Sequence, residues 1–411
     1  MPVRSRADAW RPSPLALACL AALALPAAPA AGQESDRVGA FVDERITHDD
    51  NVFRLSKQAD PATVIGSPSR ADTLLTTSAG LNLDLPLSRQ RFLGSLTLSH
   101  THYQRFSNLD YDGHDLRTLW QWQAGESTRG ELGYTDSETL ASFANVVGTA
   151  PDRLGLRQAW ANGDWRLTPS WHLKGGVSRL EQSNSDPARQ VNDAEISGAE
   201  AGASYLSRAG NSIGFSLRAE EGSFPQPQPV GALLVDNAYR QIGAGVSADW
   251  SSGGATRLSL RAEQVERRYQ QLPQRDFDGL LARAELRWRP AGKLSLALVG
   301  SRDISPYEFN RASLVLVEGA ALRPSLRLTE KLELSASLDA ARREYLGDPS
   351  QALGLSSTRI DHVRGASAAL AWRPARSVAL QLTALHESRS ANVPLGDYVV
   401  NVVAVSGRFT F

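Results

Sequence analysis

From about residue 37 onward, apolar and polar side chains alternate one by one along short segments of this chain. The segment KLELSASLDA, residues 331–340, is typical: leucine or alanine stands at every even number, and a charged residue or serine at every odd one. A period of two places successive side chains on opposite faces of a β-strand. Each such strand therefore has one apolar face and one face that carries charge.

The segments are separated by two kinds of connection. Short turns, such as residues 86–89 and 374–376, alternate with longer polar loops, such as residues 49–70 and 222–237. Bacterial outer-membrane barrels have this asymmetry of short periplasmic turns and longer outer loops, and an even number of strands. The segments predict about 18 strands. Proline avoids strand interiors, so at Pro324, which falls within a segment, we expect a bulge or a local fray.

The charged faces exclude a dry interior. Arg283, Glu285 and Arg287 share one face of a single segment, and isolated charges are too costly to bury. Within hydrocarbon only helices and closed sheets can pair all their backbone groups, and after residue 31 no apolar run is long enough for a spanning helix. We therefore predict an all-β, transmembrane, antiparallel up-and-down barrel with a wet lumen. A soluble β-sandwich with tryptophan in its core is the alternative.

The first 31 residues have the layout of a signal peptide. Arg4, Arg6 and Arg11 precede the apolar run 15–26, and small residues follow it. A basic start, a short apolar stretch and a small-residue cleavage site are typical of secretion signals. The prediction is a cleaved signal at residues 1–31, a barrel at residues 32–411, and a place in the outer membrane of a Gram-negative cell after export through the periplasm.

Aromatic residues recur at the strand ends. Four tryptophans stand shortly before tight turns and one stands just after a turn, which predicts a girdle at the membrane interface: Trp165, Trp250, Trp288, Trp372 and Trp171. The chain ends on a strand-like segment with Phe409 and Phe411 on one face. Such an aromatic end resembles the C-terminal strand that the barrel-assembly machinery recognises, so that machinery and outer-membrane lipid are expected partners.

The charged face supplies candidate pore-lining residues. These are Arg218, Arg257, Arg261, Glu263, Arg283, Glu285, Arg287, Lys331, Glu333 and Arg373. They could form a selectivity lining for an anionic solute or chain. The alternative is a set of arginines and glutamates that pair with one another and merely tolerate water.

Motifs for catalysis, cofactors and metals are weak. His100 and His102 lie on one strand face without an evident third ligand, and residues 110–115 only resemble a fragment of a calcium loop. The GNSIG of residues 210–214 joins two strand segments, whereas a nucleophile elbow joins a strand to a helix. The chain lacks the basic excess of nucleic-acid-binding proteins. We expect no catalytic residue, cofactor or metal, no nucleic-acid partner, and no enzyme.

Several stretches resemble the EpsL-type family of exopolysaccharide-operon outer-membrane proteins, which is associated with exosortase systems. The likeness is carried by DDNVFRL (residues 49–55), LPLSRQR (85–91), RDFDG (275–279) and REYLGD (343–348). The resemblance implies a role in the export or surface assembly of an extracellular polysaccharide.

Two functions follow as hypotheses. The first is a pore or scaffold for a secreted polysaccharide, working with periplasmic export proteins. The second is a general diffusion porin for small solutes, in which residues 222–237 would fold inward as the constriction. Barrels of about 16 to 18 strands can enclose an aqueous channel, so the strand count is compatible with both.

Overall fold

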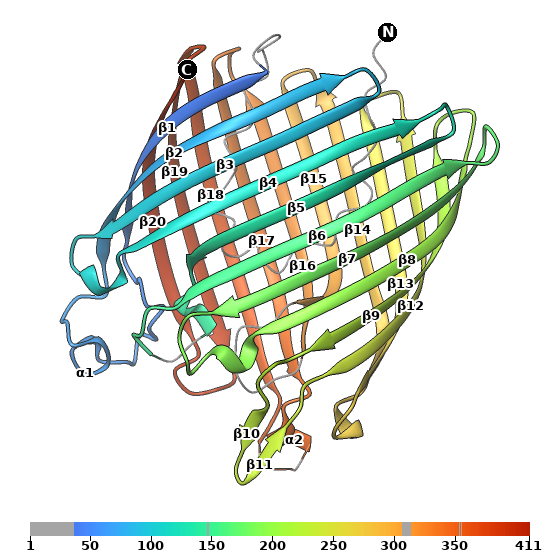
Figure 1. Ribbon diagram of the computed structural model, residues 1–411. Coiled ribbons are helices and arrows are strands. Elements are labelled where there is room, and N and C mark those ends of the chain that lie inside the picture. Colours follow the sequence, from blue (N-terminus) through green and yellow to red (C-terminus); the bar gives the residue numbers. More distant parts are fainter. Residues whose placement is uncertain (1–36, 146–147, 306–313, 353, 355) are drawn as a thin grey trace.

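A closed sheet of eighteen antiparallel strands forms the molecule (Figure 1). The computed structural model describes residues 37–145, 148–305, 314–352, 354 and 356–411, so the predicted signal peptide lies outside the described residues. Each strand pairs with its neighbours along the chain, and β20 pairs with β1 to close the barrel. The predicted fold class and strand count are confirmed. The strands are β1 (Val38–Asp49), β2 (Asp72–Leu87), β3 (Gln90–Tyr103), β4 (Tyr111–Ala124), β5 (Thr128–Leu140), β6 (Arg153–Arg166), β7 (Trp171–Asn184), β8 (Ala194–Leu206), β9 (Ser212–Ser223), β12 (Tyr239–Ser252), β13 (Thr256–Tyr269), β14 (Phe277–Ala291), β15 (Leu294–Ser305), β16 (Leu314–Arg327), β17 (Leu332–Leu346), β18 (Arg359–Ala375), β19 (Val378–Ala391) and β20 (Tyr398–Thr410).

Short turns gather at one end of the barrel and long loops at the other (Figure 1). The turn between β2 and β3 has only Ser88 and Arg89 outside the strands, and Ser88 takes a positive φ of 58° to make it. The loops at the other end hold the helices α1 (Pro61–Ile65) and α2 (Pro349–Ala352), and a separate hairpin of β10 (Gln228–Val230) and β11 (Leu233–Val235). Neither helix is long or apolar enough to cross a membrane, and the same holds for every helix among the described residues.

A repeated WRPA motif interrupts the strand pairing in the same way at two turns. In β14 the register with β15 shifts between Trp288 and Ala291, and in β18 the register with β19 shifts between Trp372 and Ala375. Each shift contains a proline, Pro290 or Pro374, which has no N–H to donate to a ladder. At Pro324 the β16–β17 ladder loses the pairs between Leu322 and Ser325 but keeps its register, and Pro324 still pairs with Leu296 of β15, so the local fray is present and the bulge is not.

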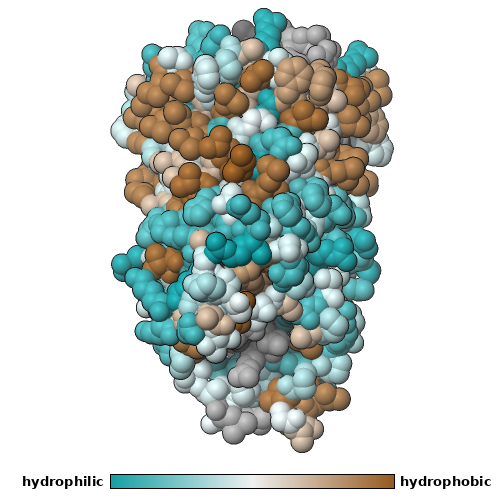
Figure 2. Space-filling model, turned by 90° about the vertical axis from the view of Figure 1, so that its left-hand side faces the viewer, coloured by the Kyte–Doolittle hydropathy of each residue, from teal (hydrophilic) through white to brown (hydrophobic). Residues whose placement is uncertain are grey.

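The outer surface is divided into two zones along the barrel axis (Figure 2). Near the short turns, the outward side chains are apolar; Val246, Leu338 and Val405 are each more than half exposed. We call this zone the apolar belt. Toward the long loops the same strand faces turn polar, and we call this zone the polar collar. Its outward-facing residues include His48, His100, His102, Asp112, His114, Arg157, Arg179, Glu181, Glu266, Arg268, Arg302, Glu318, Arg342, His362 and Arg364.

Three of the long loops meet in an apolar cluster, which we call the mouth cluster. It comprises Val52, Phe53, Tyr103, Phe106, Leu109 and Phe143, from the connections that follow β1, β3 and β5 and from the end of β3. The ring of Phe53 lies 4.9 Å from that of Phe106 and 4.7 Å from that of Phe143. Tyr103 belongs to the inward face of β3, since Leu98 on the opposite parity is exposed outside. The cluster therefore draws these loops toward the mouth of the barrel.

Residues 49–55 fasten the first strand to the last. The Asp50 carboxylate accepts hydrogen bonds from the backbone N–H and the side-chain amide of Asn401, at 2.8 and 2.7 Å. The Asn51 amide donates to the carbonyls of Leu55 and Val399. Because Asn401 and Val399 belong to β20, the DDNVFRL motif acts as a clasp across the closure of the barrel.

Candidate functional site

Strands β13 and β14 place a column of arginines on the lumen side of the barrel wall. Leu260 and Leu286 are exposed on the outer face, so residues of odd number on both strands face inward. Arg257 lies directly opposite Arg287, and Arg261 directly opposite Arg283. Like charges directly opposite each other repel across an antiparallel pair. The arrangement therefore requires water, a neighbouring acid or an anion between the guanidinium groups.

One arginine of this column, Arg261, shares two acids with Arg218 of β9, and these acids lie on β8 and on β13 itself. Arg218 on β9 and Arg261 both approach Glu200 and Glu263, at distances between 3.4 and 4.0 Å. Glu263 is 94% buried by its neighbours, being only 6% exposed. It lies over Gly243, where a Cβ atom would come within 2.1 Å of its Oε1. Around Glu263, the arginines and glutamates of the wall therefore pair with one another, as the alternative interpretation of the charged face expects.

Closer to the short turns the positive charge exceeds the negative charge. Arg283 and Arg287 share the single acid Glu285, and Arg283 Nη1 is buried without a hydrogen-bond partner. Neither Arg257 nor Arg289 has a side-chain hydrogen bond or ion pair within the part of the chain that the structure describes. This part of the wall therefore carries a net positive charge into the lumen.

The remaining predicted lining residues are less uniform. Glu333 faces inward and accepts a hydrogen bond from the Ser325 hydroxyl, and Arg373 shares the inward parity of β18. Lys331 corrects the prediction: it lies in the turn before β17, and its Nζ donates to the carbonyl of Pro374 at 2.8 Å. Because the turn folds back at this point, Lys331 belongs to the rim and not to the wall.

The inner wall near the long loops is packed with arginines stacked on tyrosine rings. Arg267 lies 3.8 Å from the centre of the Tyr239 ring, and the Tyr239 hydroxyl donates to Glu220 at 2.7 Å. The same stacking joins Arg359 to Tyr345 and Arg389 to Tyr398. Cation–π contacts of this kind gain strength when they are desolvated. These stacks stiffen the loop end of the barrel.

Two loop arginines show how burial and partners compete. Burial opposes the charge of Arg54, but the nearby Asp49 carboxylate prevails and raises the pKa of its guanidinium. Arg275, in the loop between β13 and β14, has its pKa lowered because burial outweighs its attraction to Tyr269 and Asp236. Arg275 is held by Asn237, whose amide oxygen accepts its Nη2 at 2.6 Å.

The predicted constriction at residues 222–237 is wrong in its placement. These residues form the β10–β11 hairpin, which extends beyond the long-loop end of the barrel (Figure 1). Leu233 and Leu234 at its tip are exposed, while Val235 at its base is buried. Proline and glycine are common both in a separate tight hairpin and in a loop that folds into the lumen, so the composition of residues 222–237 could not distinguish the two. The mouth cluster, from other loops, is what folds toward the lumen.

The aromatic residues lie on the outer face near the short turns. Trp165, Trp171, Trp250, Trp288 and Trp372 are each about half exposed there. Phe409 and Phe411 also face outward, with ring centres 4.9 Å apart. Trp120 was missed by the sequence analysis, although it stands five residues before the turn at Gly125. Its ring stacks on that of Phe92, with the ring centres 5.7 Å apart.

The weak metal motifs resolve into ordinary pairs. His100 and His102 each contact one carboxylate, Asp112 at 2.8 Å and Asp110 at 2.7 Å. Among the described residues, no group of three or more metal-ligating side chains comes together. Gly210 belongs to the turn between β8 and β9 and has a φ of +79°, whereas Gly214 is already part of β9.

Comparison with known proteins agrees with this architecture. Residues 242–411 match the family model described as "Putative beta-barrel porin 2". The closed barrel, the apolar belt around it and this family match together place the protein in the outer membrane. The chain is an outer-membrane β-barrel. No curated protein matches the sequence.

Solved structures with a similar barrel fold have low sequence identity to this chain. OccK2 (OpdF) of Pseudomonas aeruginosa is 10% identical, covering 91% of this chain and 98% of its own, with a TM-score of 0.48. OpdK of the same organism, solved with vanillate, is 11% identical over 91% and 99%, with a TM-score of 0.47. OccAB3 of Acinetobacter baumannii is 11% identical over 91% and 99%, with a TM-score of 0.46.

Proposed function

We propose that this barrel is a diffusion pore for small anionic solutes and not an enzyme. The observation that carries the proposal is the arginine column of β13 and β14, where Arg257 and Arg287 face each other and Glu285 is the single acid shared by Arg283 and Arg287. Charged rings and columns in a wet pore select ions of the opposite sign. The porin description of the family model that matches residues 242–411 supports the same class of function.

The test is the ion selectivity of the purified protein in a planar bilayer under a salt gradient. Wild-type protein should show a reversal potential on the anion-selective side. The double variant Arg283→Glu, Arg287→Glu should move it toward cation selectivity. The matched control is Arg153→Glu, Arg157→Glu, which makes the same change of charge on the outer face of β6. If the lumen pair and the outer pair have the same effect, or neither has any, the column does not set selectivity.

Export of a polysaccharide is the second candidate function, and it is supported by the sequence resemblance. The DDNVFRL stretch that carries much of this resemblance forms the clasp between β1 and β20. The need to close the barrel can therefore explain why this stretch resembles the EpsL-type family, and no contact with a polysaccharide is required. In this second function, periplasmic export proteins would be the partners of the barrel. If deletion of the gene abolishes the extracellular polysaccharide while the selectivity experiment fails, export replaces diffusion as the function.

A further inference from the structure

A trench of small residues crosses the outer face of β15 to β17 at the edge of the apolar belt that borders the polar collar. Gly300, Ala320 and Ala340 stand directly side by side on the three strands, and Arg364 of β18 continues their row. The next row toward the short turns is Leu298, Leu322 and Leu338. A row without side-chain bulk beside a row of leucines leaves a hollow running across the strands.

The opposite side of the trench is a row of charged residues in the polar collar. Arg302, Glu318, Arg342 and His362 are successive cross-strand partners. Glu318 pairs with Arg302 and also with Arg342, whose second partner is Glu344 at 2.9 Å. The Arg364 side chain has no hydrogen bond or ion pair among the described residues. Three guanidinium groups thus surround the trench, with Glu318 as the acid that stands among them.

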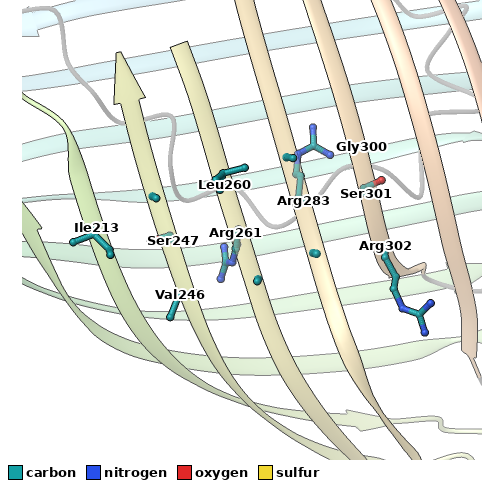
Figure 3. Close-up of a pocket in the computed structure, with 13 residues that line it drawn as sticks. Ile213, Val246, Ser247, Leu260, Arg261, Arg283, Gly300, Ser301 and Arg302 are labelled. Atoms are coloured by element: carbon teal, nitrogen blue, oxygen red, sulfur yellow. The ribbon is translucent and has the colours of Figure 1, made fainter. Parts of the chain in front are cut away.

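Two hollows mark the ends of this feature. One, of about 580 Å³, lies over β12 to β15 and is bounded by Val246, Leu260 and Arg302 (Figure 3). Its floor is made of small residues, including Ala262 and Ala282, and is almost wholly apolar. The other, of about 280 Å³, lies over β16 to β18 between Arg342 and Arg364 and is the more polar of the two. Apolar and cationic hollows are therefore adjacent, at the level where hydrocarbon meets head groups.

We propose that this trench is a binding site for a phosphorylated glycolipid of the outer leaflet. Its acyl chains would lie on the alanine and leucine rows, which offer a smooth apolar bed, and its phosphate would contact Arg342 and Arg364. Arginine is well suited to this because its planar guanidinium matches phosphate geometry with two parallel hydrogen bonds. The site depends on the position of the barrel in the outer membrane and is independent of what passes through the lumen.

The test is retention of lipid by the intact detergent-solubilised barrel, followed by native mass spectrometry. The probes are bisphosphorylated lipid A and its dephosphorylated form. Wild-type protein should hold the phosphorylated lipid, and Arg342→Gln, Arg364→Gln should weaken its retention about tenfold, the change expected when a strong contact is lost. Ala320→Leu, Ala340→Leu fills the trench but keeps the arginines, and should reduce retention as well.

The control is Arg153→Gln, Arg157→Gln, which removes two arginines from the outer face of β6 and should leave retention unchanged. Heat-modifiable mobility on a gel shows that each variant is folded. Equal retention of the phosphorylated and dephosphorylated lipids overturns the proposal, as does equal retention by the trench variants and the control. A lipid-free dimer that the trench variants abolish would also overturn it, since the trench would then join two copies of the chain.

Discussion

Arg257 and Arg287 lie directly opposite each other on β13 and β14, and both side chains face the lumen. Neither has an acid to itself, because Glu285 serves both Arg283 and Arg287. The opposed like charges therefore cost the sheet some stability, and in the proposed function they attract anions.

Arg257→Gln separates these two effects. Removing one of two opposed cations should raise the free energy of unfolding by about 0.5 kcal/mol, the order of a cross-strand charge term. It should also reduce anion selectivity. Urea unfolding in lipid vesicles measures the first effect and the reversal potential measures the second. Arg261→Gln is the control, because Arg261 is paired with Glu200 and Glu263 and its loss should destabilise the barrel. A stabilised variant with unaltered selectivity would contradict the assigned role.

Adjacent residues on β12 test the orientation of the wall. Val246 is 55% exposed in the apolar belt, and Ser247 next to it faces the lumen. Val246→Arg should destabilise the barrel by up to about 2–4 kcal/mol, the cost of an arginine at the bilayer midplane, because the guanidinium would lie in the apolar belt. Ser247→Arg should cost much less, since the lumen is wet. Unfolding free energies in vesicles compare the two, and equal losses would mean that the belt does not face lipid.

Phe53 is the ring on which the mouth cluster depends. It is 4% exposed and contacts rings from two other loops. Phe53→Ala should weaken the cluster by about 3 kcal/mol, a usual cost for a buried phenylalanine. The loop that carries Lys57 and Arg70 should then be cut faster by trypsin. Leu234→Ala, at the exposed tip of the β10–β11 hairpin, is the control and should not change the rate. Unchanged cleavage of the Phe53 variant would show that the loop is held by other contacts.

The clasp between Asp50 and Asn401 should contribute to closure of the barrel. Asp50→Ala removes two exposed hydrogen bonds to the Asn401 amide and backbone N–H, which should cost about 0.5–1.5 kcal/mol. Asn401→Asp places two carboxylates together and should be at least as harmful. The measurement is the temperature at which the folded form is lost on a gel. If Asp50→Asn in the Asn401→Asp background restores none of the loss, the two side chains do not act as a pair.

The strands could be predicted from sequence because a period of two is a local property. The segment 331–340 shows its apolar and polar faces without reference to any other strand, and β17 begins at Leu332 as that pattern requires. The ion pairs could not be predicted in this way, because they depend on register. Glu200 lies in an alanine- and glycine-rich stretch with no special signal, yet pairing with β7 and β9 brings it to Arg218 and Arg261.

The positions of loop and rim residues could not be predicted from a local sequence pattern either. Lys331 has the parity of an inward residue, but the turn in which it lies places its Nζ at the Pro374 carbonyl. The mouth cluster brings together Phe53, Phe106 and Phe143 from three separate connections. Their meeting is a consequence of barrel curvature, which sets distances between loops that no single segment encodes.

The polar collar sets the height of the barrel entrance above the apolar belt. On β13 the apolar outer residues end at Ala262, while the strand continues to Tyr269, which is about 20 Å of further wall along the strand. The entrance therefore stands clear of the apolar belt and of the hydrocarbon around it. Shortening the loops would not lower the entrance, because the strands themselves extend beyond the apolar belt.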